Sequence, residues 1–213
     1  MRPVRFARHV LLGVTSSVAA WLIHESLASG SAAFKFSMAT AYVAAALLGA
    51  TFALGPIYYL RLRRAPVSTY LRRDISIWAG LFALVHVAFG LQVHFAGRMW
   101  AYFIDPSPEA GAVPIRYDAF GLTNYLGAAA AVIIAILLAV SNDASMRRLG
   151  MDRWKSLQRT AYLGGAIIVA HSVIFQLLEK RDARFVVAFA TVVAAVLTLR
   201  ALSLWSKRDR RRV

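Results

Sequence analysis

Five histidines are the side chains of this sequence best suited to chemistry, because cysteine is absent. The lack of thiols excludes thiolate catalysis, iron–sulfur clusters and zinc sites built from cysteine. His86 and His171 lie well inside long apolar segments, where an ionisable side chain is costly and is therefore a functional candidate. His9, His24 and His94 lie near the ends of such segments, where contact with water or lipid headgroups is enough to explain them.

His86 and His171 are expected at similar depth in a membrane. His86 lies 11 residues into its apolar segment and His171 lies 14 residues into its own, or about 16 and about 21 Å of helix. Two neutral imidazoles on different helices at matching depth are able to bind the iron of a haem from both axial sides, and a flat apolar porphyrin suits the inside of a helical bundle. The spacing therefore predicts haem, with these two residues as the metal ligands. The alternative is that each histidine makes a hydrogen bond between helices.

Glycines accompany both candidate ligands. Gly90 follows His86 by four residues and Gly164 precedes His171 by seven, so each glycine is near the helical face of its histidine. A glycine at such a position allows a porphyrin to approach the backbone closely, although close helix packing also favours glycine. His94 follows His86 by eight residues, about 12 Å further along a helix, and is an alternative partner for His171.

The elements that must position these residues are membrane-spanning helices. Of the 213 residues, 59% are hydrophobic and only 16% are charged, which excludes an ordinary soluble domain. A helix that crosses the hydrocarbon core needs about 20 mostly apolar residues. We therefore expect an all-α bundle of six transmembrane helices that forms one integral membrane domain over residues 1–213, with haem between the third and fifth helices. The predicted spans are residues 9–28, 34–60, 75–96, 119–140, 157–178 and 184–205.

The charge distribution predicts the orientation of the bundle. The formal net charge is +15, and 19 of the 25 Lys and Arg residues fall in residues 2–8, 61–73, 147–159 and 200–212. These segments are the two termini and every second connection between the six spans, so they lie on the same side of the membrane. The positive-inside rule then predicts that both termini are cytoplasmic. Anionic lipid headgroups explain these basic runs, so no nucleic-acid partner is expected. On the opposite side, Arg98 and Arg116 are candidates for pairing with haem propionates or with an external partner, and an ordinary loop role is equally open.

Several short motifs resemble a known family of membrane proteins. They are LRRD at 71–74, Trp78, LVH at 84–86, RRLG at 147–150, WKSLQR at 154–159, Tyr162 and His171. These motifs resemble the third- and fifth-helix regions of the ferric-reductase-like transmembrane family, and within it the haem-binding membrane subunits of bacterial periplasmic methionine sulfoxide reductase systems. The resemblance in topology covers about residues 34–205.

The resemblance implies a multi-pass haem b protein of the bacterial cytoplasmic membrane that carries electrons across it. It places the axial ligands at His86 and His171. The family usually has an earlier histidine on the fifth helix, and here that position is Gln158, a poor haem ligand. FMN or a quinone is then an alternative inner carrier, or the chain holds a single haem. Arg73, Arg159, Trp154 and Gln158 are the candidate contacts of a haem propionate, a flavin or an electron donor.

The predicted function is that of an electron-transfer subunit of an oxidoreductase, without a catalytic side chain of its own. Electrons would come from a cytoplasmic flavin reductase or the membrane quinol pool, because the sequence contains no dinucleotide-binding fingerprint. The acceptor would be an extracytoplasmic reductase subunit or ferric iron. The alternative is a haem-free membrane scaffold or assembly protein that retains the fold. A transporter is disfavoured because no charged residue lies in the middle of a predicted span.

Overall fold

The computed structural model describes residues 3–62, 69–105 and 114–209, and most of these residues are helical. Six helical segments within the described ranges are long and apolar enough to cross a membrane, as predicted. The elements are α1 (Pro3–Ser26), α2 (Ala32–Leu62), α3 (Thr69–Gly90), the short 3-10 helix η1 (Met99–Tyr102), α4 (Ala119–Ala139), α5 (Asp143–Leu149), α6 (Met151–Gln158), α7 (Ala161–Leu178) and α8 (Ala183–Asp209).

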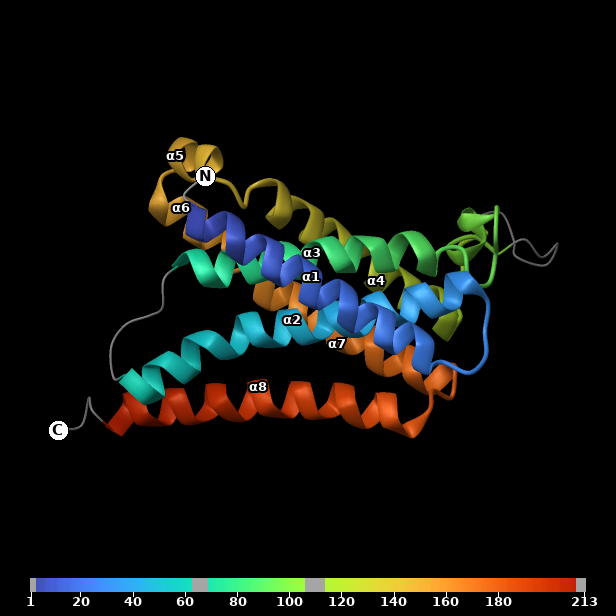
Figure 1. The fold of residues 1–213 in the computed structure, drawn as a ribbon. Coiled ribbons are helices and arrows are strands. Elements are labelled where there is room, and N and C mark those ends of the chain that lie inside the picture. Colours follow the sequence, from blue (N-terminus) through green and yellow to red (C-terminus); the bar gives the residue numbers. More distant parts are fainter. Residues whose placement is uncertain (1–2, 63–68, 106–113, 210–213) are drawn as a thin grey trace.

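The long helices run roughly side by side, so that the bundle has two distinct ends (Figure 1). One end holds the beginning of α1 and the end of α8, and we call it the termini end; the opposite end holds η1, and we call it the η1 end. Helix α2 packs against α1, α3 and α8, whereas α7 packs mainly against α4, which also contacts α3. This arrangement leaves α7 facing α2 and α3 across the interior of the bundle.

Helix α3 differs most from its predicted span, because it covers Thr69–Gly90 rather than residues 75–96. Its polar first turns are part of the helix because Asp74 is fully buried and is bound by Arg5 and Arg8 of α1. At its other end, the carbonyl oxygen of Gly90 accepts a hydrogen bond from the hydroxyl group of Tyr102, at 2.8 Å. His94 therefore lies in a turn beyond α3 and not in a transmembrane helix.

The fifth predicted span, residues 157–178, also needs correction at its start. The chain forms α6 up to Gln158, turns at Arg159 and Thr160, and continues as α7 from Ala161. The backbone N–H of Arg159 bonds to the carbonyl groups of Lys155 and Ser156, which closes α6 with a tight turn. The edges of the other four helices lie within a few residues of the prediction, apart from longer ends on α1 and α8 at the termini end.

The first and last helices agree with the predicted topology in that both have a terminus at the termini end of the bundle (Figure 1). Which side of a membrane this end faces is not tested by the fold, so the cytoplasmic location of the termini stays a prediction. Part of the charge pattern behind it, including residues 63–64 and 210–212, lies outside the described residues.

Candidate cofactor site

A cavity of about 1020 Å³ occupies the interior of the bundle between α2, α3, α4 and α7. Its volume is at the upper limit of the roughly 300–1,000 Å³ typical of sites for small molecules and cofactors. The middle of the cavity is lined mainly by alanine, glycine, leucine and isoleucine side chains, whereas polar residues gather at both ends. An elongated cavity of this kind fits a large, flat and mostly apolar ligand with polar groups at its edge.

His86 projects from α3 into this cavity. Its Nδ1 atom lies 3.0 Å from the backbone carbonyl oxygen of Ser37 on α2 and 3.1 Å from the hydroxyl oxygen of the same residue. A carbonyl oxygen only accepts hydrogen bonds, so Nδ1 carries the proton and donates it. In the neutral imidazole, the lone pair is then on Nε2, which leaves that atom able to bind a metal.

His171 repeats this arrangement from the other side of the cavity. Its Nδ1 atom lies 2.8 Å from the backbone carbonyl oxygen of Thr123 on α4. The same reasoning places the proton on Nδ1 and the free lone pair on Nε2. Room for the ring comes from Gly127, where an added Cβ atom would lie 2.9 Å from Cε1 of His171. Gly127 was not predicted as a site residue, and only its four-residue spacing from Thr123 could have pointed to it.

The two histidines share the feature that prepares an imidazole to bind a metal. Metal-binding histidines usually donate their second ring N–H to a carbonyl or carboxylate group, which fixes the tautomer and the ring orientation. Within the described ranges, no group of three or more His, Asp or Glu side chains could hold a metal ion by itself. A pair of imidazoles suits a metal that brings its remaining ligands with it, as haem iron does.

The two predicted glycines border the cavity in different ways. A Cβ atom added to Gly90 would lie 3.4 Å from Oγ of Ser37 and 3.8 Å from Cε1 of His86, so this glycine leaves space beside the candidate ligand. A Cβ atom added to Gly164 would instead lie 3.1 Å from Ile133 of α4, which is a contact between helices. Close approach of a porphyrin to either glycine stays a prediction.

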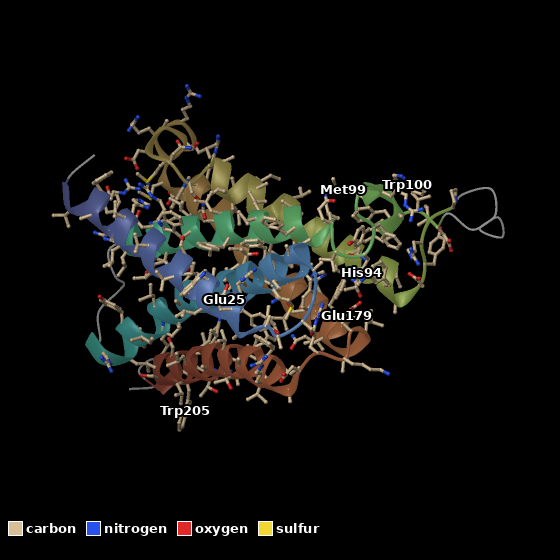
Figure 2. The ribbon with its side chains drawn as sticks, turned by 45° about the vertical axis from the view of Figure 1, so that its right-hand side comes forward. Glu25, His94, Met99, Trp100, Glu179 and Trp205 are labelled. Carbon is tan, nitrogen blue, oxygen red and sulfur yellow. The ribbon has the colours of Figure 1, made fainter. Side chains whose placement is uncertain are left out.

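His94 lies at the η1 end of the cavity and has a different kind of partner. Its Nε2 atom is 3.5 Å from Oε1 of Glu179, and both residues lie at that end of the bundle (Figure 2). The ring also meets Phe120 edge-on, with centroids 5.4 Å apart. Because a carboxylate already faces Nε2, His94 is less ready to bind a metal than His86 or His171. Its role as an alternative ligand stays a prediction.

The four residues predicted to contact a propionate, flavin or donor all line the termini end of the cavity. Trp154 is buried, and its indole N–H donates to the carbonyl group of Val140 at 3.0 Å, which attaches α6 to the end of α4. The Gln158 amide nitrogen lies 3.3 Å from Oγ of Ser141. Other polar residues that line this end include Arg72, a further cation expected near the electron entry side, and Lys155, Tyr162 and Arg200, which were not predicted as site contacts.

Arg73 is the most buried cation at the termini end. One of its terminal nitrogens lies 2.6 Å from Asp143 of α5, and this guanidinium holds the pKa of the Asp143 carboxyl group below its ordinary value. Its Nε and second terminal nitrogen are buried without a hydrogen-bond partner among the described residues. Arg73 thus retains unused donors at the wall of the cavity, which suits an anionic group of a ligand.

A cluster of charges beside this end attaches α1 to α3. The fully buried Asp74 carboxylate lies 3.2 Å from Arg5, 2.9 Å from Arg8 and 3.2 Å from Nε2 of His9. None of these four residues lines the cavity. His9 and the arginines were expected to be interfacial, and the role of Asp74 was not predicted, because their pairing depends on the contact between two helices.

The fold and the cavity define a helical membrane protein whose interior cavity is lined by two histidines, each with its Nδ1 atom beside a backbone carbonyl oxygen. No profile of a known protein family matches the chain. It is similar in sequence to curated bacterial proteins named protein-methionine-sulfoxide reductase heme-binding subunit MsrQ. The relative from Bordetella pertussis is 28% identical over 161 residues, which cover 74% of this chain and 69% of the relative.

Two further relatives carry the same name. The protein from Herminiimonas arsenicoxydans is 31% identical over 133 residues, or 62% of this chain and 56% of that protein. The protein from Ralstonia nicotianae is 36% identical over 80 residues, or 38% of this chain and 36% of that protein. The predicted resemblance to haem-binding subunits of methionine sulfoxide reductase systems is confirmed. The resemblance to the broader ferric-reductase-like family stays a prediction.

Proposed function

We propose that this chain is a haem b subunit that carries electrons across the bacterial cytoplasmic membrane, with His86 and His171 as the axial ligands. The observation that carries the proposal is the matched pair of imidazoles on α3 and α7. Each has its Nδ1 atom on a backbone carbonyl group and lines the same cavity. The similarity to proteins named as haem-binding subunits supports the same cofactor.

The residues around the site would hold and insulate this cofactor. Haem, when bound, supplies a carrier that accepts and releases one electron at a time. Ser37 and Thr123 keep the Nδ1 protons in place, so that both Nε2 atoms stay available for iron. The apolar lining would keep water away from the metal. Phe175 lines the cavity beside His171, and its ring packs against Phe120.

Electrons would enter from the termini end, which the positive-inside rule assigns to the cytoplasm. The unused donors of Arg73 and the nearby Arg159 and Lys155 suit an anionic group or a polar headgroup at that end. This supports FMN or a quinone as an inner carrier, with a cytoplasmic flavin reductase or the quinol pool as the donor. The amide group of Gln158 donates a hydrogen bond to Ser141. A glutamine with a protein partner at the position of the family's earlier histidine fits a chain that binds one haem.

The acceptor would lie on the opposite side of the membrane, at the η1 end. The names of the relatives favour a methionine sulfoxide reductase as the partner, and at the η1 end it would be extracytoplasmic. Ferric iron is the second candidate acceptor. A turnover assay with each acceptor and the chemically reduced protein separates the two.

The proposal is tested by an absorption spectrum of the purified full chain in detergent. We expect a Soret band, a reduced α-band typical of low-spin haem b, and about one haem per chain, as two axial histidines imply. His86→Ala and His171→Ala should each abolish this spectrum. His24→Ala is the matched control, because His24 pairs with Glu25 on the exposed part of α1.

A chain without a Soret band would reject the electron-transfer function and favour the alternative, a haem-free membrane scaffold or assembly protein. Retention of the low-spin spectrum in both histidine variants would reject the ligand assignment while leaving haem binding intact.

A further inference from the structure

Arg181 is a cation with no role predicted from the sequence, and it lines the η1 end of the cavity. Its position follows from how α7 ends. The N–H of Arg181 bonds to the carbonyl group of Gln176 and the N–H of Lys180 to that of Leu177, the two bonds of a Schellman motif. Lys180 adopts the left-handed conformation that this motif requires, with φ of 47°. The reversal keeps Arg181 against the bundle, with only 16% of its side chain exposed.

The guanidinium of Arg181 has few partners for a charge in this position. Its nearest carboxylate, that of Glu179, is 4.0 Å away, and its carbon lies 4.8 Å from the centre of the Phe34 ring. Within the described part of the chain, its polar partner is this long ion pair to Glu179, and the Tyr42 side chain of α2 is a further electrostatic neighbour. Burial lowers the pKa of Arg181 from its ordinary value, which reflects a cation partly removed from water. A ligand carboxylate would supply the missing acceptor.

Gln176 adds a second unsatisfied polar group at the same end of the cavity. Its amide nitrogen donates to the carbonyl group of Ser172 at 3.1 Å, which fixes the orientation of the amide. The other amide atom, Oε1, is buried without a hydrogen-bond partner among the described residues. An unused donor at Arg181 and an unused acceptor at Gln176 suit a pair of carboxyl groups, one ionised and one protonated.

Distances along the helices favour Arg181 over the cations of the termini end as the partner of a ligand bound at the histidines. Arg181 follows His171 by ten residues, at most about 15 Å of helix. Arg159 precedes His171 by twelve residues and Arg73 precedes His86 by thirteen, about 18 and about 20 Å. Arg73 also has a close carboxylate of its own in Asp143.

Two other arginines at the η1 end are less suitable. Arg116 is already engaged, since its Nε atom lies 3.0 Å from Asp118 and its terminal nitrogen donates to the carbonyl group of Ala101 at 2.9 Å. Arg98 is exposed and does not line the cavity. The earlier expectation that Arg98 or Arg116 binds an acidic group of the cofactor is therefore weaker than the case for Arg181.

We propose that Arg181 binds a propionate of the haem held by His86 and His171, so that the acidic edge of the porphyrin faces the η1 end. This assignment rests on the proposed function, because it requires haem at these two histidines. Arg181 is a positioning residue here: it fixes the orientation of the cofactor, and its charge favours the reduced state of the iron.

The test combines Arg181→Gln with a change in the cofactor. The full chain and the variant are each loaded with haem and with haem dimethyl ester, which lacks ionisable carboxyl groups, and transfer of the cofactor to apomyoglobin is followed. We expect Arg181→Gln to speed dissociation of natural haem about tenfold or more, since a charge-assisted hydrogen bond is lost. The substitution should have little effect on dissociation of the ester.

Two matched variants and a measurement of the haem midpoint potential complete the experiment. Arg181→Lys should restore most of the retention of haem, whereas Arg184→Gln, at an exposed arginine three residues away, should behave like the unchanged chain. Arg181→Gln should also lower the midpoint potential while the low-spin spectrum stays the same, because a cation near the iron is lost.

The possible failures are distinguishable. If the unchanged chain shows no haem spectrum, the proposed function fails and the assignment of Arg181 fails with it. If haem binds normally and Arg181→Gln alters neither dissociation nor potential, only the assignment of Arg181 is wrong. A third outcome is that haem dissociation depends on Arg159 and on the haem carboxyl groups, but not on Arg181. This result would show that the acidic edge of the porphyrin faces the termini end.

Discussion

The Nδ1 atom of His171 lies 2.8 Å from the backbone carbonyl oxygen of Thr123, so a main-chain group of α4 orients a candidate ligand on α7. His86 has the equivalent partner in the carbonyl group of Ser37 on α2. Neither acceptor can be removed by a change of side chain, which makes both tautomers depend on how the helices pack. The packing of α4 against α7 is therefore part of the cofactor site itself.

This dependence predicts a large effect for Gly127→Ala. The new Cβ atom would lie 2.9 Å from Cε1 and 3.0 Å from Nδ1 of His171, so the ring must move away from Thr123. Loss of an orienting partner typically reduces metal affinity about 10–100-fold, and we expect a comparable drop in haem affinity, measured by titration with haem.

The matched control for this substitution is Gly55→Ala, because a Cβ atom at Gly55 has nothing within 4 Å. Alanine favours a helix over glycine by up to about 1 kcal/mol, so neither variant should unfold. Equal haem affinities in the two variants would contradict the role of Gly127.

The fold was predictable because each span is long and apolar, and the errors arose where polar residues find partners in another helix. The start of α3 was placed too late because Arg73 and Asp74 look unsuitable for a span, yet both are buried against charges from α1 and α5. Hydropathy along one segment contains no information about such partners.

The candidate ligands were also predictable, because a histidine deep in an apolar span is rare and costly. The carbonyl groups that orient them were not, since every residue has one and the sequence does not show which is free to accept. Arg181 escaped notice for a related reason: the reversal at Lys180, which directs it to the cavity, occurs at a non-glycine residue.

Removal of the charge at Asp74 should weaken the attachment of α1. Asp74→Asn would leave Arg5 and Arg8 without their carboxylate, and hydrogen bonds to charged groups typically contribute about 1.5–3 kcal/mol each. Both arginines are partly exposed, so we expect a net loss of about 1–3 kcal/mol in the free energy of unfolding. Thermal unfolding in detergent measures it, with Asp152→Asn on the exposed surface of α6 as the control. Equal melting temperatures for the two variants would refute this prediction.

The contact between Arg73 and Asp143 should make stability depend on pH only in strongly acidic solution. Arg73 lowers the pKa of Asp143 below its ordinary value of 3.8. The contact therefore stabilises the fold above pH 3.8, and its contribution decreases as the pH falls through the still lower pKa of the folded state. The stability difference between the unchanged chain and Asp143→Asn should be constant from pH 7 to about pH 5 and shrink below about pH 4. A difference already lost at pH 5 would show that this pKa is not lowered.

The left-handed conformation of Lys180 predicts that glycine is the better residue at this position. A non-glycine residue with φ of 47° is disfavoured by about 1 kcal/mol or more. Lys180→Gly should therefore raise the free energy of unfolding by about 0.5–1 kcal/mol, because the α7 ending is kept and its strain is removed. Lys35→Gly, in the first turns of α2, is the control with the opposite sign, since glycine within a helix costs about 0.5–1 kcal/mol. Chemical unfolding measures the free energy of unfolding of both variants. If Lys180→Gly is less stable than the unchanged chain, the side chain of Lys180 makes a contact that stabilises the fold by more than the backbone strain destabilises it.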